Sequence, residues 1–367
     1  MTGGIYAGLM SGTSADGIDV ALARLDGQGR IQRVVAQDHH PLPADLSAAI
    51  RASGPDASLA ELHDLDQRLA DAFSDALLDS LARSPPPEPP LAVGCHGQTV
   101  WHTGRTSMPP ASIQLADGNR IAARTGLPTV TDFRRRDLAE GGEGAPLTPA
   151  FHAHCWRRRG ESRSVLNLGG IANITLLPAE GGVSGFDVGP ANTLLDHWAR
   201  THLGRSYDEA GHWASGGKVD PRLLERLLAD PYFVRPPPKS TGPEHFSPAW
   251  LDHHLQGDER PQDVQATLAE LTAAAVGDAL RRWCPTPPER LWACGGGARN
   301  DDLLARLARH CPGCRIATTR ELGIEPDYVE ALAFAWLAWA RLAGHPGSIP
   351  EVTGARRAAV LGALYHP

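Results

Sequence analysis

Asp16 and Asp19 lie close together in a glycine-rich stretch near the start of the chain, residues 8–20, which also carries small hydroxyl side chains. Glycine lets backbone N–H groups approach a phosphate closely, and the hydroxyls add donors. The two carboxylates have the chemistry that holds a hydrated Mg²⁺ beside such a phosphate. An ordinary hairpin can have the same composition, so this stretch alone leaves both interpretations open. The residues expected to contact the phosphates are Gly12, Thr13, Ser14, Ala15, Asp16, Gly17, Ile18 and Asp19.

Two more glycine clusters occur later in the chain, each directly after a short apolar run. The first contains Asn167, Gly169 and Gly170, and a second apolar run follows it, as in residues 8–20. The other leads into a helical pattern, so its N–H groups face whatever lies at that helix N-terminus. Three such loops predict a nucleotide held in a cleft between two similar lobes. The residues of the last cluster are Gly295, Gly296, Gly297 and Asn300.

Asp187 is a carboxylate among residues that restrict the backbone. Gly185, Gly189 and Pro190 around it predict a fixed, non-helical bend, and the next helix is expected to begin at Thr193. A carboxylate held in one orientation suits proton abstraction. Asp also caps helices and turns commonly, and the residues alone leave this second role open.

Two common nucleotide motifs are absent from the sequence. No G-x-x-x-x-G-K-[ST] phosphate loop occurs, and residues 216–219 are only a near miss; a Rossmann fingerprint is absent as well. Phosphoryl transfer would therefore depend on backbone amides, Mg²⁺ and one positioned carboxylate.

The elements that must position these residues alternate between strands and helices, which indicates an α/β fold. Residues 58–83 have helical periodicity and begin with a capping box, Ser58 and Glu61. A buried strand over 91–95 leads to His96, and a strand over 127–131 leads to Asp132 and three arginines. Further helices are expected at 118–125, 193–202, 221–229, 262–283, 301–309 and 327–343.

Length and composition limit the classes of protein. A chain of 367 residues exceeds what one core usually serves, so we expect two lobes, residues 1–150 and 151–367. The net charge of −7 argues against nucleic acid or an anionic membrane as partner. Six scattered cysteines without a secretory leader are typical of the cytoplasm, and Cys311 and Cys314 are expected in a plain turn. The longest apolar run, residues 331–340, is too short for a bilayer and predicts a buried helix.

Eight short motifs, in order from one end of the chain to the other, resemble those of the anhydro-N-acetylmuramic acid kinases, a family of the actin/hexokinase/Hsp70-like ATPase superfamily. Each motif alone is weak, but the combination is specific and spans the whole chain. The motifs are residues 8–19, 96–99, 132–134, 141–147, 167–173, 186–192, 239–242 and 353–355. The resemblance implies a two-lobed, duplicated α/β fold of the actin/hexokinase (ribonuclease H-like) type with a nucleotide cleft between the lobes. The N-terminal lobe would carry the first phosphate loop and part of the sugar site, and the C-terminal lobe would carry the second phosphate loop, the catalytic aspartate and the adenosine loop.

The same resemblance implies the reaction. ATP would phosphorylate O6 of 1,6-anhydro-N-acetylmuramic acid while water opens the anhydro bridge, giving N-acetylmuramic acid 6-phosphate and ADP, a step of peptidoglycan recycling. It implies Asp187 as the base that takes the proton of this water, with Asp19 as the expected Mg²⁺ ligand. Arg134 would pair with the lactyl carboxylate, with Arg135 and Arg136 left as alternatives. The groups expected to bind the acetamido and hydroxyl groups are His96, Gln98, Gln114 and Asp132.

Two positions depart from the family pattern. Position 143 is Glu where the family favours Gln, and position 188 is Val where Thr is usual. Glu143 adds negative charge near an anionic sugar, and Val188 removes a hydroxyl beside the base, so both bear on substrate preference.

Three other classes remain open as alternatives. A related sugar kinase would use Asp187 to deprotonate a free hydroxyl in place of water. A non-catalytic sugar-binding regulator of the same fold would need a DNA-binding appendage, and a chaperone-like ATPase would need a substrate-binding domain after the lobes; we expect neither. The sequence leaves the oligomeric state undecided, including a homodimer.

Overall fold

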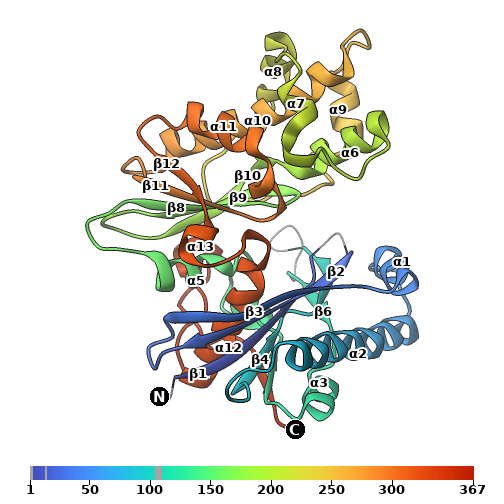
Figure 1. Ribbon diagram of the computed structural model, residues 1–367, viewed down its shortest axis with the longest axis vertical. Helices are drawn as coiled ribbons and strands as arrows, with labels where there is room; N and C mark the ends of the chain where they lie inside the picture. Colours follow the sequence, from blue (N-terminus) through green and yellow to red (C-terminus); the bar gives the residue numbers. More distant parts are fainter. Residues whose placement is uncertain (1–2, 13–14, 104–109) are drawn as a thin grey trace. The chain divides into compact units, whose positions relative to one another are not determined.

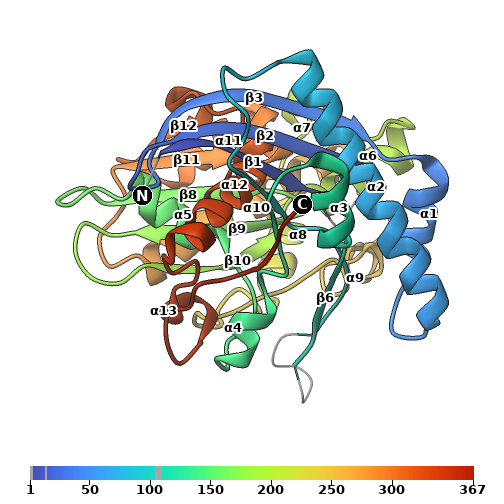
Figure 2. The ribbon, with the colours of Figure 1, turned by 90° about the horizontal axis from the view of Figure 1, so that it is seen from below.

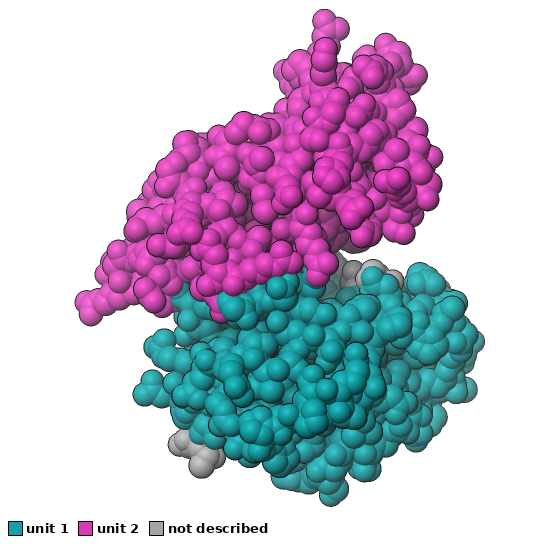
Figure 3. Space-filling view, in the orientation of Figure 1, with its two compact units in different colours: residues 1–156, 323–367 teal, residues 157–322 magenta. Residues whose placement is uncertain are grey.

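The computed structural model describes residues 3–12, 15–103 and 110–367, so Thr13 and Ser14 of the first phosphate loop lie outside the described residues. The chain forms two compact units, drawn in teal and magenta in Figure 3. Unit 1 consists of residues 1–156 and 323–367, and unit 2 of residues 157–322. Each unit has its own sheet and its own buried core, which confirms the α/β class.

Unit 1 is built on a six-stranded mixed sheet. In spatial order its strands are β13 (Ala363–Tyr365), β7 (Thr129–Thr131), β4 (Ala92–Cys95), β1 (Gly4–Met10), β2 (Gly17–Leu25) and β3 (Ile31–Pro41). Strands β1 and β2 form the expected antiparallel hairpin, and β4 lies parallel to β1 on its other side. A separate hairpin of β5 (Gln98–His102) and β6 (Ser112–Leu115) follows β4.

Helices cover this sheet on both faces, as Figures 1 and 2 show. On one face α12 (Val329–Ala343) packs against β1, β2 and β4. On the other, α2 (Leu59–Arg83) joins the apolar core of β1 and β2, and α1 (Ala44–Ala52) and α3 (Gly118–Thr125) pack against α2. The remaining helices of this unit are short: α4 (Arg135–Ala139), α5 (Thr148–Trp156), α13 (Pro350–Thr353) and the 3₁₀ turn η5 (Pro326–Tyr328).

Two glycines let α12 lie directly on the sheet. Gly8 of β1 and Gly94 of β4 are register partners on adjacent parallel strands. A Cβ at Gly8 would collide with the main-chain oxygen of Ala331, and one at Gly94 with that of Phe334. The close approach of helix backbone to sheet therefore requires glycine at both positions.

The segment 323–367 belongs to unit 1, whereas the expected division near residue 150 assigned it to the second lobe. Within this segment α12 buries its apolar side chains against β1, β2 and β4, and β13 extends the same sheet by pairing with β7. The amphipathic pattern of a helix does not reveal which sheet it covers. The sequence therefore could not show that residues 323–367 pack against the first sheet.

Unit 2 repeats the pattern of a hairpin beside a parallel strand. Its five strands, in spatial order, are β10 (Ser184–Pro190), β9 (Ile171–Leu177), β8 (Arg163–Leu168), β11 (Arg290–Cys294) and β12 (Arg315–Thr318). Strands β8 and β9 are antiparallel, and β11 lies parallel to β8, just as β4 lies beside β1. The two strand–glycine–strand units expected from the sequence are thus confirmed.

The helices of unit 2 surround α10 (Pro261–Trp283), which is largely buried and contacts β10 and four other helices. They are α6 (Asn192–Leu203), α7 (His212–Ser215), α8 (Pro221–Leu228), α9 (Pro248–His254) and α11 (Asp301–His310), with 3₁₀ turns η2 (Glu209–Gly211), η3 (Gly296–Arg299) and η4 (Thr319–Leu322). The expected helices at 193–202, 221–229, 262–283 and 301–309 match these bounds to within one or two residues.

The capping box that the sequence predicts is confirmed. Ser58 and Glu61 form the capping box of α2, with the Glu61 carboxylate accepting the Ser58 N–H at 2.8 Å. All six cysteines are free, Cys311 and Cys314 included, and no cluster of metal-binding side chains occurs among the described residues. Within the described part of the chain, no helix combines the length and apolar character that crossing a bilayer requires.

Candidate active site

The first glycine loop connects β1 to β2 and is tied to the start of β5. The carbonyl oxygen of Gly12 accepts the Ala15 N–H at 3.1 Å and the Gln98 side-chain amide at 3.3 Å. Ala15 has a φ of 51°, a conformation that non-glycine residues rarely adopt. The loop therefore brings Gln98, predicted for the sugar, next to Gly12, predicted for the phosphates.

Two buried polar atoms in this region have no hydrogen-bond partner among the described residues. They are the Ser11 Oγ and the Gln98 Oε1, on side chains that are 1% exposed. Buried polar groups are almost always paired. The Ser11 hydroxyl in the phosphate loop and the Gln98 carbonyl oxygen, on a side chain that contacts Gly12, are therefore available to bind a ligand. The sequence did not single out Ser11, although its hydroxyl lies in the same motif.

The other residues of the first loop have mixed roles. Gly17, Ile18 and Asp19 already belong to β2; the Ile18 side chain is in the apolar core, and a Cβ at Gly17 would collide with the His39 ring. The Asp16 carbonyl oxygen accepts the Leu42 N–H at 3.1 Å. These contacts fix the loop, while its N–H groups remain the expected phosphate donors.

Asp19 is paired within the protein. Its Oδ1 lies 2.8 Å from His39 Nδ1, and burial raises the pKa of its carboxyl despite this contact. Mg²⁺ usually keeps several waters and takes one or two protein carboxylates beside substrate phosphates. Asp19, with Asp16 close enough to affect its pKa, has the donor set for such a partial shell.

His96 and Arg134, both predicted for the sugar, are in direct contact. Arg134 donates through Nη2 (2.8 Å) and Nε (3.3 Å) to His96 Nε2, so His96 carries its proton on Nδ1, which donates to the Gly97 carbonyl at 2.8 Å. A third Arg134 donor reaches the Gly144 carbonyl at 2.8 Å. Burial and the Arg134 charge hold the pKa of His96 well below its usual value, and burial lowers that of Arg134 to about 10. The guanidinium is thus fixed, charged at neutral pH, and has N–H groups left for a ligand.

The neighbouring arginines face elsewhere. Arg135 lies 3.6 Å from the Asp132 carboxylate, and Arg136 donates to Glu140 at 2.9 Å. Both line an open hollow of about 670 Å³ together with Asp132, Arg341 and Arg357. Asp132 itself has a φ of 55°, and burial raises the pKa of its carboxyl. The structure therefore separates Arg134 from Arg135 and Arg136, which the sequence could not do.

Gln114 lies on the β5–β6 hairpin, where its side-chain amide donates to Thr99 Oγ1 at 3.1 Å and to Ser112 Oγ at 2.9 Å. These bonds occupy both amide hydrogens and leave its carbonyl oxygen for a substrate donor.

Asp137 organises two of the family motifs and was not singled out in the sequence. Its fully buried carboxylate accepts the Gly144 N–H and the Thr353 hydroxyl, each at 2.8 Å. The Glu143 N–H in turn donates to the Thr353 carbonyl at 2.9 Å. Residues 141–147 and 353–355 therefore hold each other in place. The Gly144 carbonyl, fixed in this way, accepts a hydrogen bond from Arg134.

The second and third glycine loops lie together in unit 2. Asn192 joins them to α6: its side-chain amide donates to the Leu168 carbonyl at 2.9 Å, and its N–H donates to the Gly169 carbonyl at 3.0 Å. A Cβ at Gly295 would collide with the Asn167 side chain, and one at Gly170 would come within 2.6 Å of the Thr193 hydroxyl. Gly296 and Gly297 begin η3, where Gly297 packs closely on Leu168.

Asn300 has a structural role in addition to any contact with nucleotide. Its Oδ1 accepts the Leu303 N–H at 2.9 Å and caps the N-terminus of α11. The helix that follows the third loop thus begins where the sequence predicts.

Asp187 lies in β10, beside Asn173 of β9, at an irregularity in the register between Asp187 and Gly189. Its carboxylate accepts the Thr241 N–H at 3.0 Å, its own N–H donates to the Lys239 carbonyl at 3.2 Å, and the Tyr232 hydroxyl donates to its carbonyl at 2.7 Å. Helix α6 has Ala191 as its N-cap residue, with no side-chain cap bond. The alternative role of Asp187 as the cap of that helix is therefore wrong.

The electrostatics of Asp187 suit a base. Burial raises the pKa of its carboxyl to about 6, against the lowering effects of the Thr241 N–H and the Lys239 charge. A base with a pKa just below neutral is ionised at pH 7 and still accepts a proton readily. Val188, by contrast, is buried in the apolar core of unit 2, so it lies on the opposite face of the strand from Asp187.

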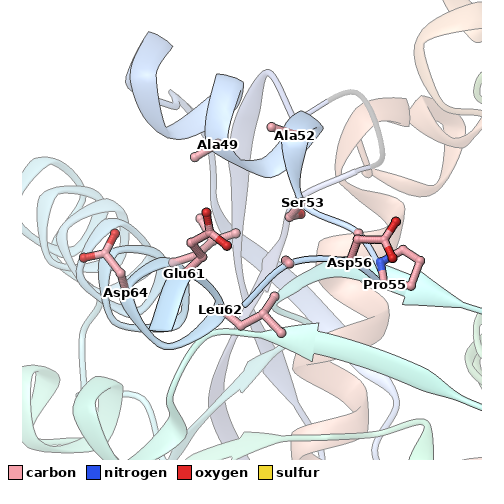
Figure 4. A pocket seen from close by; sticks show the side chains of 11 residues that line it. Ala49, Ala52, Ser53, Pro55, Asp56, Glu61, Leu62 and Asp64 are labelled. Atoms are coloured by element: carbon pink, nitrogen blue, oxygen red, sulfur yellow. The ribbon is translucent and has the colours of Figure 1, made fainter. Parts of the chain in front are cut away.

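A further hollow, of about 420 Å³, lies between α1 and the start of α2 and is shown in Figure 4. None of the residues predicted for the site lines it. Asp56, Glu61 and Asp64 make it acidic, and Glu61 is already engaged in the capping box of α2. It is a feature of helix packing at a distance in sequence from every family motif.

Comparisons with known proteins agree with these motifs. A family model described as anhydro-N-acetylmuramic acid kinase matches residues 4–367. Curated proteins of that name from Coxiella burnetii, strains Dugway 5J108-111 and RSA 493 / Nine Mile phase I, are each 46% identical over 366 residues, covering 98% of this chain and 97% of theirs.

Solved structures with similar folds are much more distant in sequence. Component A of (R)-2-hydroxyglutaryl-CoA dehydratase from Acidaminococcus fermentans is 12% identical, with a TM-score of 0.47 over 93% of this chain and 99% of that one. Xylulose kinase from Rhodospirillum rubrum is 14% identical, with a TM-score of 0.46 over 99% of this chain and 94% of that one. By its match to the family model and its identity with the curated relatives, the chain belongs to the anhydro-N-acetylmuramic acid kinase family.

Proposed function

We propose that this chain uses ATP and water to convert 1,6-anhydro-N-acetylmuramic acid into N-acetylmuramic acid 6-phosphate and ADP. The kinase activity follows from membership of the family. The observation that supports the hydrolytic half is the environment of Asp187: a half-buried carboxyl, fixed by the Thr241 N–H, with a pKa raised by burial to about 6.

Apart from one proton transfer, the chemistry requires two bonds to form and two to break. In the anhydro sugar O6 is bonded to C1, so no 6-hydroxyl exists to receive a phosphoryl group. Water attacks C1 and forms the new C1–O bond, Asp187 takes a proton from this water, and the C1–O6 bond breaks. O6 then bonds to the γ-phosphorus of ATP as the bond to the β,γ-bridging oxygen breaks, and ADP leaves. The proton on Asp187 returns to solvent.

Arg134 is the proposed partner of the lactyl carboxylate. Its guanidinium is fixed by His96 and the Gly144 carbonyl, and it keeps N–H groups for a planar anion. Gln98 Oε1, buried and without a described partner, is available to accept a sugar N–H or O–H. His96, Gln114 and Asp132 remain proposed sugar contacts.

The glycine loops are the proposed nucleotide contacts. In the first, Ser11 Oγ adds a hydroxyl that has no partner among the described residues to the N–H groups around Gly12. In unit 2, the glycines at 169–170 and 295–297 would approach the nucleotide without side chains in the way. Mg²⁺ would be held by Asp19 with the phosphates and would neutralise the charge that develops on them.

The experiment that tests the reaction uses ATP and 1,6-anhydro-N-acetylmuramic acid in ¹⁸O-water, with mass spectrometry of the product. We expect one ¹⁸O at C1 of a 6-phosphorylated sugar. A phosphorylated product that lacks the label or keeps its anhydro bridge would instead indicate a kinase acting on a free hydroxyl.

Arg134→Ala tests the sugar assignment. We expect KM for the muramic substrate to rise by about 10–100-fold, the loss of a charge-assisted contact of roughly 1.5–3 kcal/mol. The anhydro-glucosamine analogue, which has no lactyl group, is the control and should change little. Equal losses for both sugars would show that Arg134 serves the fold or the phosphates.

The cytoplasm is the proposed location, which the six free cysteines support. A homodimer stays a prediction that light scattering would check.

A further inference from the structure

Lysine is rare in this chain, and one of its two lysines is buried beside Asp187. Of 35 basic residues, 33 are arginine; the lysines are Lys218 and Lys239. Lys218 is exposed, whereas Lys239 is 6% exposed. A buried ammonium is costly unless it is paired, so its surroundings need an explanation.

The ammonium group of Lys239 binds main-chain oxygens and an aromatic ring. Its Nζ donates to the carbonyl oxygens of Tyr232 at 3.1 Å and Phe233 at 3.3 Å, and lies 4.6 Å from the centre of the Tyr232 ring. No carboxylate of the described residues comes within ion-pair distance of it. The compact ammonium, with three donors that rotate together, fits this arrangement of two carbonyls and a ring.

The contacts of Lys239 with Tyr232 and Phe233 close the loop formed by residues 232–241. Residues 232–233 and 239–241 are the two ends of a segment that contains Pro236, Pro237 and Pro238. Lys239 joins one end to the other through its side chain, and both ends contact Asp187: the Tyr232 hydroxyl and the Lys239 carbonyl on its main chain, the Thr241 N–H on its carboxylate.

We propose that Lys239 is a positioning residue for Asp187, which closes the 232–241 loop so that the Thr241 N–H holds the carboxylate in the orientation that faces the attacking water. This inference rests on the proposed role of Asp187 as the base. Lys239 does not touch the reacting atoms; it acts through the loop and through its charge.

The charge gives the proposal a measurable signature. The ammonium of Lys239 and the Thr241 N–H lower the pKa of Asp187, whereas burial and the Glu244 carboxylate raise it. Tyr232, the other titratable group in contact, stays neutral because burial raises its pKa. Burial lowers the pKa of Lys239 to about 8, and the charged groups that also act on it are Arg235 on the same loop, Asp278 and Arg282 on α10, and Asp187 itself. Loss of the ammonium should therefore raise the pKa of Asp187.

Lys239→Met is the test variant, and Lys218→Met is the matched control: the same substitution at the other lysine of unit 2. For Lys239→Met we expect the acid limb of kcat/KM to move to higher pH by up to about 1 unit, because an opposite charge that favours the ionised carboxyl is removed. Turnover at pH 6, near the pKa of Asp187, should then fall by up to about fivefold, because fewer molecules carry the ionised base, with a smaller loss at pH 8.5. Lys218→Met should retain the wild-type profile.

A purely structural lysine would lower Tm and leave the acid limb in place, and that result would overturn the inference. If Lys239→Met does not fold, Lys239→Gln keeps N–H donors for the two carbonyls while removing the charge, and its acid limb should move in the same direction. An unmoved limb in Lys239→Gln would overturn the inference equally.

Asp187→Asn separates this inference from the proposed function. If Lys239 acts through Asp187, adding Lys239→Met to Asp187→Asn should cost less than threefold in the remaining activity. If Asp187→Asn alone retains near-normal turnover, the base assignment fails and the positioning role fails with it. If Asp187→Asn is inactive but the acid limb of Lys239→Met does not move, the inference about Lys239 alone is wrong.

Discussion

The carboxylate of Asp187 is held in one orientation, and its burial makes the charged form unfavourable. A carboxylate in water keeps its ordinary pKa, and the position of a carboxylate on a strand does not by itself direct it toward a proline-containing loop about 50 residues away. Here the strand irregularity at Gly189 and the Thr241 N–H fix its direction, while burial keeps it close to protonation. Such perturbed groups concentrate at functional sites.

Asp187→Asn should separate catalysis from folding. The amide is nearly isosteric and can still accept the Thr241 N–H, but it cannot take a proton from water. We expect kcat to fall by about 10²–10⁴-fold, the range of general-base catalysis, with a much smaller change in KM. Steady-state kinetics and a melting curve on the same preparation measure both effects. Near-normal turnover would remove Asp187 from the reaction.

The pH dependence of activity and stability should run in opposite directions at this residue. The base works when ionised, so kcat/KM should fall as the pH drops through about 6. For stability, a folded-state pKa above the unfolded value means that the native state binds the proton more tightly, so ionisation of Asp187 disfavours folding as the pH rises from about 4 to about 6. The difference in Tm, Asp187→Asn minus wild type, should therefore be more positive at pH 8 than at pH 4.5. A difference in Tm that is equal at both pH values would contradict the raised pKa.

At the scale of elements, the close contact of α12 with the sheet depends on two glycines, which have no side chain. Gly8 and Gly94 are register partners, and any Cβ there meets main-chain oxygens of α12, which cannot rotate away. The helix and the two strands therefore form one tightly packed layer.

Gly94→Val should destabilise unit 1 strongly. The side chain has no space below Phe334, so the helix must move or the strand must bend, at a cost of about 1–3 kcal/mol or more. Gly54→Val is the control, because no atom lies within 4 Å of a Cβ at that position. Chemical denaturation of both variants measures the difference. Equal midpoints for the two would show that α12 does not depend on this contact.

The sequence predicted most elements because their signals are local. The capping box at Ser58, the glycine hairpin after Met10 and the apolar periodicity of residues 262–283 depend on neighbours within a few positions, and each element formed where expected. The family motifs added Asp187 and Arg134, whose roles remain proposals.

Contacts between distant segments could not be predicted. Thr241 and Lys239 reach Asp187 across more than fifty residues, Asp137 joins Gly144 to Thr353, and α12 returns to the first sheet. No local pattern encodes such pairings, because they depend on the packing of whole layers. The missed Ser11 is different: its hydroxyl lay in the motif, and only its burial without a partner among the described residues distinguished it.

At the scale of the whole molecule, the chain leaves unit 1 after Trp156 and comes back at Gly323. Unit 2 is therefore one continuous stretch with a core of its own, while unit 1 needs both ends of the chain.

A chain that stops after Leu322 should keep unit 2 and lose unit 1. It lacks α12 and β13, so one face and one edge of the first sheet are left without cover. Limited proteolysis with mass spectrometry should show a resistant core within residues 157–322 and rapid cleavage within 1–156. Residues 157–322 expressed alone are the control and should give the same core. A resistant fragment from residues 1–156 would contradict this prediction.

The return of α12 has a consequence for synthesis on the ribosome. The strands β1 and β2 are among the first residues to leave the exit tunnel, yet the helix that covers them is complete only at Ala343, about 320 residues after β2 ends at Leu25. At about 5–20 residues per second, their apolar surface waits roughly 16–64 s for its partner, while unit 2 has all of its residues before then. We therefore expect the nascent N-terminal half to be the part of this protein that binds chaperones with affinity for exposed hydrophobic surface during translation.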